Sequence, residues 1–138
     1  MTGAGAALAT AAKAYVGVPF RLHGRSRDGL DCVGLLGWAL ADCGRHVPLP
    51  QGYGLRNRDP ERLFACFLPA GFMRQEDGAP IHAGDVLAVT PGPAQQHLLI
   101  ATGEDQFVHA HAGLRRVVRT GAPLPWPVVQ HWRLDPSH

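Results

Sequence analysis

The chain has 138 residues, of which 46% are hydrophobic and 17% are charged. This balance is typical of a folded globular protein and excludes an intrinsically disordered one. A length of this order fits one compact domain, so residues 1–138 are predicted to form a single domain. The formal net charge of +2 is too small to indicate binding to nucleic acid or to a membrane surface by itself.

Cysteine usage and the N-terminal residues bear on the cellular compartment. Cys32, Cys43 and Cys66 are odd in number and lack zinc-type spacing, which disfavours a disulfide framework. No apolar run approaches the roughly 20 residues that a membrane-spanning helix needs. Residues 1–16 lack the basic start and continuous apolar core of a signal peptide, because Lys13 interrupts them. We therefore expect reduced thiols and synthesis in the cytoplasm without a signal peptide.

The first predicted element is an amphipathic helix over residues 4–16, which Gly17-Val18-Pro19 ends. A loop rich in Gly, Arg and Asp follows over residues 20–30. The residues that form one apolar face of the helix are Leu8, Ala11, Ala12 and Tyr15.

A second helix is predicted to begin at Cys32, with Asp31 as its N-cap and Gly44 just beyond its C-terminus. Gly34 and Gly37 lie off its apolar stripe and would let another element approach closely. The stripe at i, i+3, i+4, i+7, i+8 and i+11 consists of Cys32, Leu35, Leu36, Ala39, Leu40 and Cys43.

The second half of the chain changes from helical to strand-like patterns. Residues 46–58 predict a loop, and residues 60–68 a short helix with Pro60 in its first turn. Beyond Gly84, short β-type runs alternate with turn residues. These runs are residues 85–90, 97–102, 106–111, 115–119 and 128–134. N-terminal helices followed by an antiparallel meander of about five strands predict an α+β domain.

Cys32 and two distant histidines carry the chemistry. A thiol at a helix N-terminus faces unpaired N–H groups and a partial positive charge, which favour the thiolate. His97 and His109 lie on neighbouring predicted strands, and a hairpin turn at Gly103-Glu104-Asp105-Gln106 would bring them together. One imidazole can then take the thiol proton while a second polar group orients it. The pattern predicts a cysteine hydrolase.

Other interpretations of these residues stay open. His111 has the same strand parity as His109 and faces the same side, although the spacing from His97 favours His109. Asp31 is more often a helix cap than an acid. Cys32, His97 and His109 are allowed zinc ligands but contain no close-spaced ligand pair, so no metal site is predicted.

Structural roles are predicted for the remaining candidates. Cys43 and Cys66 are expected to be small buried hydrophobic residues. Trp126 and Trp132 are expected in the core or at a docking surface, with an aromatic wall of a substrate groove as the alternative. The histidines expected to be ordinary surface or loop residues are His23, His46, His82, His131 and His138.

In order and spacing, four segments resemble the NlpC/p60 family of cell-wall cysteine peptidases. They are Asp31-Cys32-Val33-Gly34-Leu35, with Val33 where the family has Ser, Gly84-Asp85-Val86-Leu87, His97-Leu98-Leu99-Ile100 and Val108-His109-Ala110. The resemblance runs from Tyr15 to about Leu134 and implies a papain-like core. It also implies Cys32 as nucleophile, His97 as base and His109 as the group that orients the base. The implied reaction needs no cofactor and cleaves peptide stems of peptidoglycan, at the bond between a γ-D-glutamyl residue and a diamino acid.

Two further segments, residues 16–21 and His109-Ala110-His111, resemble single-domain cell-wall peptidases encoded with phage tails and gene transfer agents. This resemblance implies tail or baseplate partners, and delivery by a virion-like tail to the cell wall in the periplasm. Two rival functions remain. One is an inactive structural or wall-sensing tail component, and the other is a thiol acyltransferase or amidase with a different substrate.

Phe20 departs from the family pattern, which usually has Tyr at this position with a hydroxyl that contacts the substrate or the oxyanion. Phe20 cannot donate a hydrogen bond. The oxyanion site would then depend on the Cys32 backbone N–H and a second donor. We hypothesise that His23 or a substrate-bound water supplies it.

Overall fold

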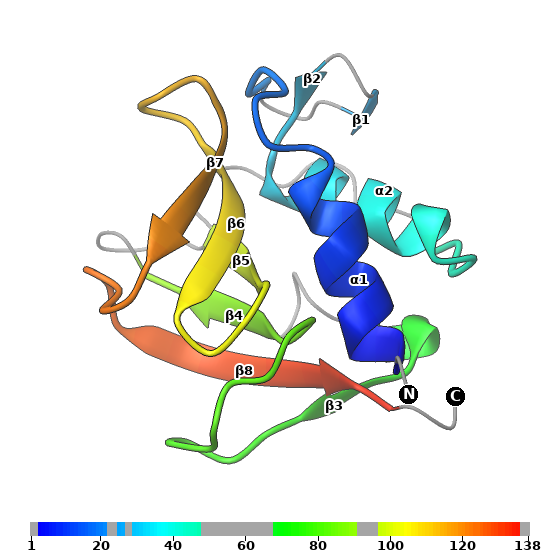
Figure 1. Ribbon diagram of the computed structural model, residues 1–138, viewed down its shortest axis with the longest axis vertical. Helices are drawn as coiled ribbons and strands as arrows, with labels where there is room; N and C mark the ends of the chain where they lie inside the picture. The colour runs from blue at the N-terminus through cyan, green and yellow to red at the C-terminus, as the bar shows by residue number, and fades with distance from the viewer. Residues whose placement is uncertain (1–2, 22–24, 27–28, 48–67, 91–96, 136–138) are drawn as a thin grey trace.

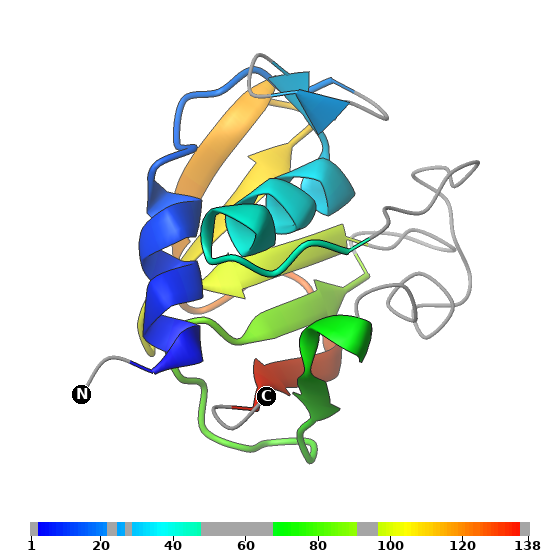
Figure 2. The same cartoon turned by 90° about the vertical axis from the view of Figure 1, so that its right-hand side faces the viewer.

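The computed structural model describes residues 3–21, 25–26, 29–47, 68–90 and 97–135. In this part of the chain, two α-helices pack on one face of a six-stranded sheet with the strand order β3-β8-β4-β5-β6-β7 (Figure 1). All adjacent strands are antiparallel. The predicted α+β class is confirmed. Figure 2 shows both helices in front of the strands, so the helices form one layer and the sheet another.

Helix α1 spans Ala4–Lys13 and is shorter than the predicted helix over residues 4–16. Beyond it, the chain tightens into turns in which the Tyr15 N–H bonds to the Ala12 carbonyl. Gly17 then takes a φ of +97°, a left-handed conformation that suits glycine and redirects the chain. Leu8, Ala12 and Tyr15 are buried as the periodicity predicted.

Residues 17–20 run beside strand β7 (Arg116–Gly121) and bond through the backbone to it and to the residue before it. The Gly17 N–H bonds to the Val117 carbonyl, the Val117 N–H to the Val18 carbonyl, and the Phe20 N–H to the Arg115 carbonyl, at 2.8 to 2.9 Å. We call residues 17–20 the clasp. The predicted loop after it was wrong in part, because it contains a short hairpin, β1 (Arg25–Ser26) with β2 (Gly29–Leu30).

Helix α2 spans Cys32–Asp42, and its ends match the predicted caps. The Asp31 carboxylate accepts a hydrogen bond from the Gly34 N–H at 2.8 Å, and Gly44 adopts a φ of +80°. The predicted single apolar stripe was too narrow, because Val33, Gly34 and Gly37 are buried as well. This helix is therefore enclosed on nearly all sides, and its N-terminus is held deep in the molecule.

Five of the six strands correspond to predicted runs. They are β4 (Val86–Val89), β5 (His97–Ala101), β6 (Gln106–His111), β7 (Arg116–Gly121) and β8 (Val128–Leu134). Strand β3 (Phe72–Arg74) follows a 3₁₀ turn at Leu68–Ala70 and corresponds to no predicted run. The simple meander was also wrong, because β8 returns to pair with β4 and β3. The predicted loop beyond residue 47 and nearly all of the predicted helix over residues 60–68 lie outside the described residues.

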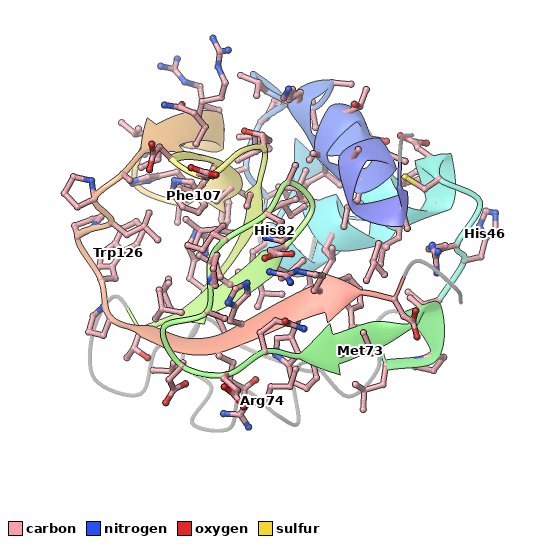
Figure 3. The ribbon with its side chains drawn as sticks, turned by 60° about the horizontal axis from the view of Figure 1, so that its bottom comes forward. His46, Met73, Arg74, His82, Phe107 and Trp126 are labelled. Atoms are coloured by element: carbon pink, nitrogen blue, oxygen red, sulfur yellow. The ribbon has the colours of Figure 1, made fainter. Side chains whose placement is uncertain are left out.

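The sheet has two buried faces with different partners. The face toward the helices carries alternate residues such as Val86, Leu98 and Val108, which share one hydrophobic cluster with α1 and α2. The opposite face carries a smaller cluster, with Leu87, Val89, Leu99, Ala101 and Phe107 in its core and Ile81, Leu124 and Trp126 packed against it. Figure 3 shows Phe107 and Trp126 near each other, on the opposite side of the view from His46.

The Gly84-Asp85 motif joins the sheet to the helices and to β8. Gly84 has a φ of +88°, and a side chain there would collide with the backbone of Gly5 in α1. The buried Asp85 carboxylate accepts hydrogen bonds from the His131 ring and from Arg133. His131 is 6% exposed, so the prediction that it is an ordinary surface or loop residue was wrong.

Candidate active site

Cys32 is the first residue of α2 and lies where the helix layer meets strand β5. Its residue surface is 6% exposed, and its thiol is free of any disulfide. Backbone hydrogen bonds from Leu98 and Val33 reach the thiol. Since Leu98 follows His97 directly, the sulfur lies beside the β5 backbone at the strand's first residues.

His97 and His109 meet through their ring nitrogens. His97 Nε2 lies 2.8 Å from His109 Nδ1, and the ring centroids are 5.0 Å apart. On its other side, His109 Nε2 lies 2.7 Å from the hydroxyl of Thr120. These three side chains form a hydrogen-bonded row across β5, β6 and β7, which we call the relay. Thr120 was not among the residues predicted from the sequence.

The relay runs diagonally across the sheet. Ile100 pairs with Val108, and continuing this register would set His97 level with His111. His109 pairs with Val118, so Thr120 is two residues along from the position opposite His109. Diagonal neighbours on one face of a sheet lie within reach of long side chains. The two histidines are therefore neighbours, as the predicted hairpin required, although their contact is diagonal.

His111 takes a different role in the structure. Its Nδ1 accepts a hydrogen bond from the Leu114 N–H at 3.1 Å, within the turn after β6. Its ring centroid lies 5.5 Å from that of His109. Of the two histidines that the sequence left open, His109 therefore makes the contact with His97.

Trp126 packs against both relay histidines. Its indole meets the His97 ring at 5.9 Å and 84°, and the His109 ring at 5.7 Å and 82°. Both contacts are edge-to-face, the arrangement that aromatic quadrupoles favour. Trp126 is half-buried and comes from the connection between β7 and β8. Trp126 therefore packs beside the two imidazoles and against the smaller hydrophobic cluster, in agreement with the expected position at the core.

Burial controls the protonation of these groups. It raises the pKa of the Cys32 thiol to about 12, with the Asp31 charge adding to the rise and the backbone hydrogen bonds opposing it. Burial lowers the pKa of His97 to about 3 and that of His109 to about 4, with neighbouring histidines adding to both shifts. The predicted thiolate was wrong for the resting site, because desolvation outweighs the helix N-terminus. The resting groups are a neutral thiol and two neutral imidazoles.

The remaining predicted residues are distributed as follows. Phe20 is half-buried at the end of the clasp and forms a bridge with Leu30, two residues before Cys32. Cys43 is half-buried and not fully buried as predicted, because it lies at the open C-terminal end of α2. His23 and Cys66 lie outside the described residues. Among the side chains that are described, no three His, Cys, Asp or Glu residues are grouped as metal ligands.

Comparison with known proteins identifies the family. The sequence model of the NlpC/P60 family matches residues 17–122, more than half of the chain. The chain belongs to the NlpC/P60 family. The predicted resemblance to the NlpC/p60 cell-wall cysteine peptidases is confirmed, and membership agrees with the predicted enzyme class. No curated protein matches the sequence significantly.

Solved NlpC/p60 structures share this fold. NlpC1 from Trichomonas vaginalis is 23% identical with a TM-score of 0.72, over 96% of this chain and 46% of that one. The NlpC/p60 domain of the peptidoglycan hydrolase SagA is 23% identical with a TM-score of 0.63, over 94% and 98% of the two chains. The peptidoglycan hydrolase RipB from Mycobacterium tuberculosis is 20% identical with a TM-score of 0.66, and the match covers 94% of this chain and 64% of RipB. The chain spans about half the length of the two Trichomonas vaginalis structures that it matches.

Proposed function

We propose that this NlpC/P60 chain is a cysteine endopeptidase that cleaves the peptide stems of bacterial peptidoglycan. The observation that carries the proposal is the hydrogen bond between His97 and His109 beside a strand backbone that contacts the Cys32 sulfur. A thiol, a base and a group that orients the base are the parts that nucleophilic acyl transfer requires. The family match supports the same substrate class.

In the proposed reaction, His97 accepts the Cys32 proton at Nδ1, because its Nε2 already contacts His109. The sulfur attacks the peptide carbonyl, and the developing oxyanion accepts hydrogen bonds from backbone N–H groups at the start of α2. The C–N bond breaks as His97 returns the proton to the leaving amine. Water then attacks the thioester while His97 takes its proton, the C–S bond breaks, and Cys32 regains a proton.

The neutral resting state agrees with this order of steps. With a thiol pKa near 12 and a His97 pKa near 3, a preformed thiolate–imidazolium pair is disfavoured. The proton therefore moves as the sulfur attacks, when substrate has displaced solvent and charge develops in the site. The bond that we propose for cleavage joins a γ-D-glutamyl residue to a diamino acid such as meso-diaminopimelate.

The setting that we propose is a phage-like or gene-transfer-agent tail that carries the enzyme to the cell wall. Tail or baseplate proteins would be its partners. None of the described helices is long and apolar enough to cross a membrane. Purified particles should contain this chain, and particles without it would contradict the tail-carried role while leaving the hydrolase proposal intact.

Digestion of purified sacculi tests the catalytic proposal. Wild type should release new amines, Cys32→Ala should release none, and Cys43→Ala, which removes the half-buried thiol at the other end of α2, should match wild type. Mass spectrometry of the muropeptides identifies the bond. No amine release by the folded wild type would contradict the proposal.

One rival function is favoured by a specific residue. Phe20 lacks the hydroxyl that the family usually places near the oxyanion, which suits an inactive wall-sensing component of a tail tip. In the sacculus assay, such a protein would sediment with the wall and release no amines. Activity on acyl esters, with none on sacculi, would instead favour the acyltransferase alternative.

A further inference from the structure

Thr120 occupies the outer end of the relay. Its hydroxyl contacts His109 Nε2 at 2.7 Å, while His109 Nδ1 contacts His97 at 2.8 Å. The His109 residue is 0% exposed, and both of its ring nitrogens are engaged by protein groups. A neutral imidazole carries one N–H and one acceptor nitrogen. The proton positions on the two histidines are therefore coupled to the hydroxyl of Thr120.

Only one arrangement of protons leaves His97 able to act as a base. In that arrangement, His97 Nε2–H donates to His109 Nδ1, and His109 Nε2–H donates to Thr120 Oγ1. His97 Nδ1 is then free of a proton. In the reverse arrangement, Thr120 donates to His109, His109 donates to His97 Nε2, and the His97 proton is on Nδ1. A ring in that form cannot accept the thiol proton at the same nitrogen.

The protonated intermediate gives an independent argument for the same arrangement. Once His97 has taken a proton, both of its nitrogens are donors. His109 Nδ1 must then accept, so His109 must carry its own proton on Nε2 and needs an acceptor there. The residues of β7 that alternate on this face are Arg116, Val118 and Thr120. Of their side chains, only that of Thr120 can accept a hydrogen bond.

We propose that Thr120 is a positioning residue whose hydroxyl accepts the His109 Nε2–H and thereby holds both imidazoles in the tautomer that leaves His97 Nδ1 free. The importance of this tautomer for turnover rests on the proposed function, whereas the tautomer itself is a property of the folded protein. Removing the hydroxyl leaves a buried N–H without its partner, a loss that disfavours the Nε2–H form.

The test compares Thr120→Val, which has a similar shape and no hydroxyl, with Thr120→Ser, which keeps the hydroxyl. Long-range ¹H–¹⁵N spectra of the imidazoles report the tautomer directly. Wild type and Thr120→Ser should show the Nε2–H form for His97 and His109, and Thr120→Val should gain the Nδ1–H form. On sacculi, kcat of Thr120→Val should fall about 10–100-fold, the size of loss known for groups that orient metal-binding histidines. KM should stay unchanged.

The spectra and the kinetics separate the possible failures. An Nδ1–H form of either histidine in wild type, or an unchanged spectrum and kcat in Thr120→Val, would overturn the proposal. Thr120→Ala also removes the hydroxyl but changes the packing differently, and it must give the same tautomer shift. If Thr120→Val does not fold, Thr120→Ala takes its place in the test. If wild type hydrolyses no sacculi, the proposed function fails, while the spectra still decide the role of Thr120.

Discussion

The indole of Trp126 meets the imidazole of His109 edge to face, with centroids 5.7 Å apart, and meets His97 in the same way. In the proposed reaction both rings must keep their orientation during proton transfer, and this contact would restrain them. We expect Trp126→Ala to lower kcat on sacculi by about 10–100-fold, since small misplacements of reacting groups are costly. Steady-state kinetics would measure the change.

Trp126→Phe is the matched control, because it keeps an aromatic edge against both histidines. It should retain most of the activity. The alanine variant should also be less stable in urea by about 1–3 kcal/mol, the order of the loss for a large side chain that is only half-buried. Equal kcat values for wild type and the alanine variant would show that the indole does not restrain the imidazoles.

The raised pKa of Cys32 predicts slow alkylation of this thiol at neutral pH. Only the thiolate reacts, so with a pKa near 12 the rate should rise about tenfold per pH unit up to pH 9. Peptide mapping after treatment with iodoacetamide separates Cys32 from the other thiols, and Cys32→Ala identifies its peptide. A rate for Cys32 that levels off below pH 7 would indicate a stable thiolate–imidazolium pair, contrary to the burial of this site.

The lowered pKa values of the two relay imidazoles predict that stability falls in mild acid. The pKa of His97 is about 3 and that of His109 about 4, whereas a histidine in the unfolded chain titrates near pH 6.5. Between these values the unfolded chain binds more protons, so the free energy of unfolding decreases as the pH falls from 6.5 toward 4. Each histidine contributes at most about 1.4 kcal/mol per pH unit.

Urea titrations between pH 7 and pH 5 would measure this slope. His109→Asn should have a smaller slope than wild type, because it removes one of the two groups. His46→Asn, at an exposed position in the segment after α2, should leave the slope unchanged. Identical slopes in wild type and His109→Asn would contradict the assignment of the acid sensitivity to the relay.

Phe20 offers a test of the oxyanion site by gain of function. If the missing hydroxyl limits the rate, Phe20→Tyr should raise kcat by about tenfold or more, since one oxyanion donor is typically worth 100–1,000-fold. Phe20→Leu supplies no donor and should give no such gain. A tyrosine variant no faster than wild type would place this side chain outside the oxyanion site. His23→Ala then tests the hypothesis that His23 compensates.

Local patterns in the sequence predicted most elements, because those elements depend on neighbouring residues. Asp31 marks the start of α2, and the limits of β6 and β8 match their predicted runs to the residue. Strand β3 was missed because it has only three residues and pairs with β8 some 60 positions later in the chain. The return of β8 beside β4 is likewise a long-range pairing that strand periodicity does not encode.

The site was predictable to the extent that one hairpin determines it. The turn between β5 and β6 brings His97 and His109 together, whereas Thr120 and Trp126 reach them only through diagonal and packing contacts. The ionisation of Cys32 was mispredicted because burial, which outweighs the helix N-terminus, depends on the whole fold. His131 was mistaken for a surface residue for a similar reason, since its partner Asp85 is 46 positions away.

The backbone bonds of residues 17–20 to β7 and to Arg115 have a consequence for the integrity of the candidate site. The chain continues from the clasp to Cys32. Strand β7, to which the clasp is hydrogen-bonded, ends with Thr120 and Gly121. The segment that leads to Cys32, the proposed nucleophile, is therefore bonded through main-chain amides to the strand that carries Thr120. Proteolytic cleavage within residues 17–20 would leave every side chain of the site chemically intact. It would nevertheless break the main-chain connection that aligns the segment leading to Cys32 with strand β7.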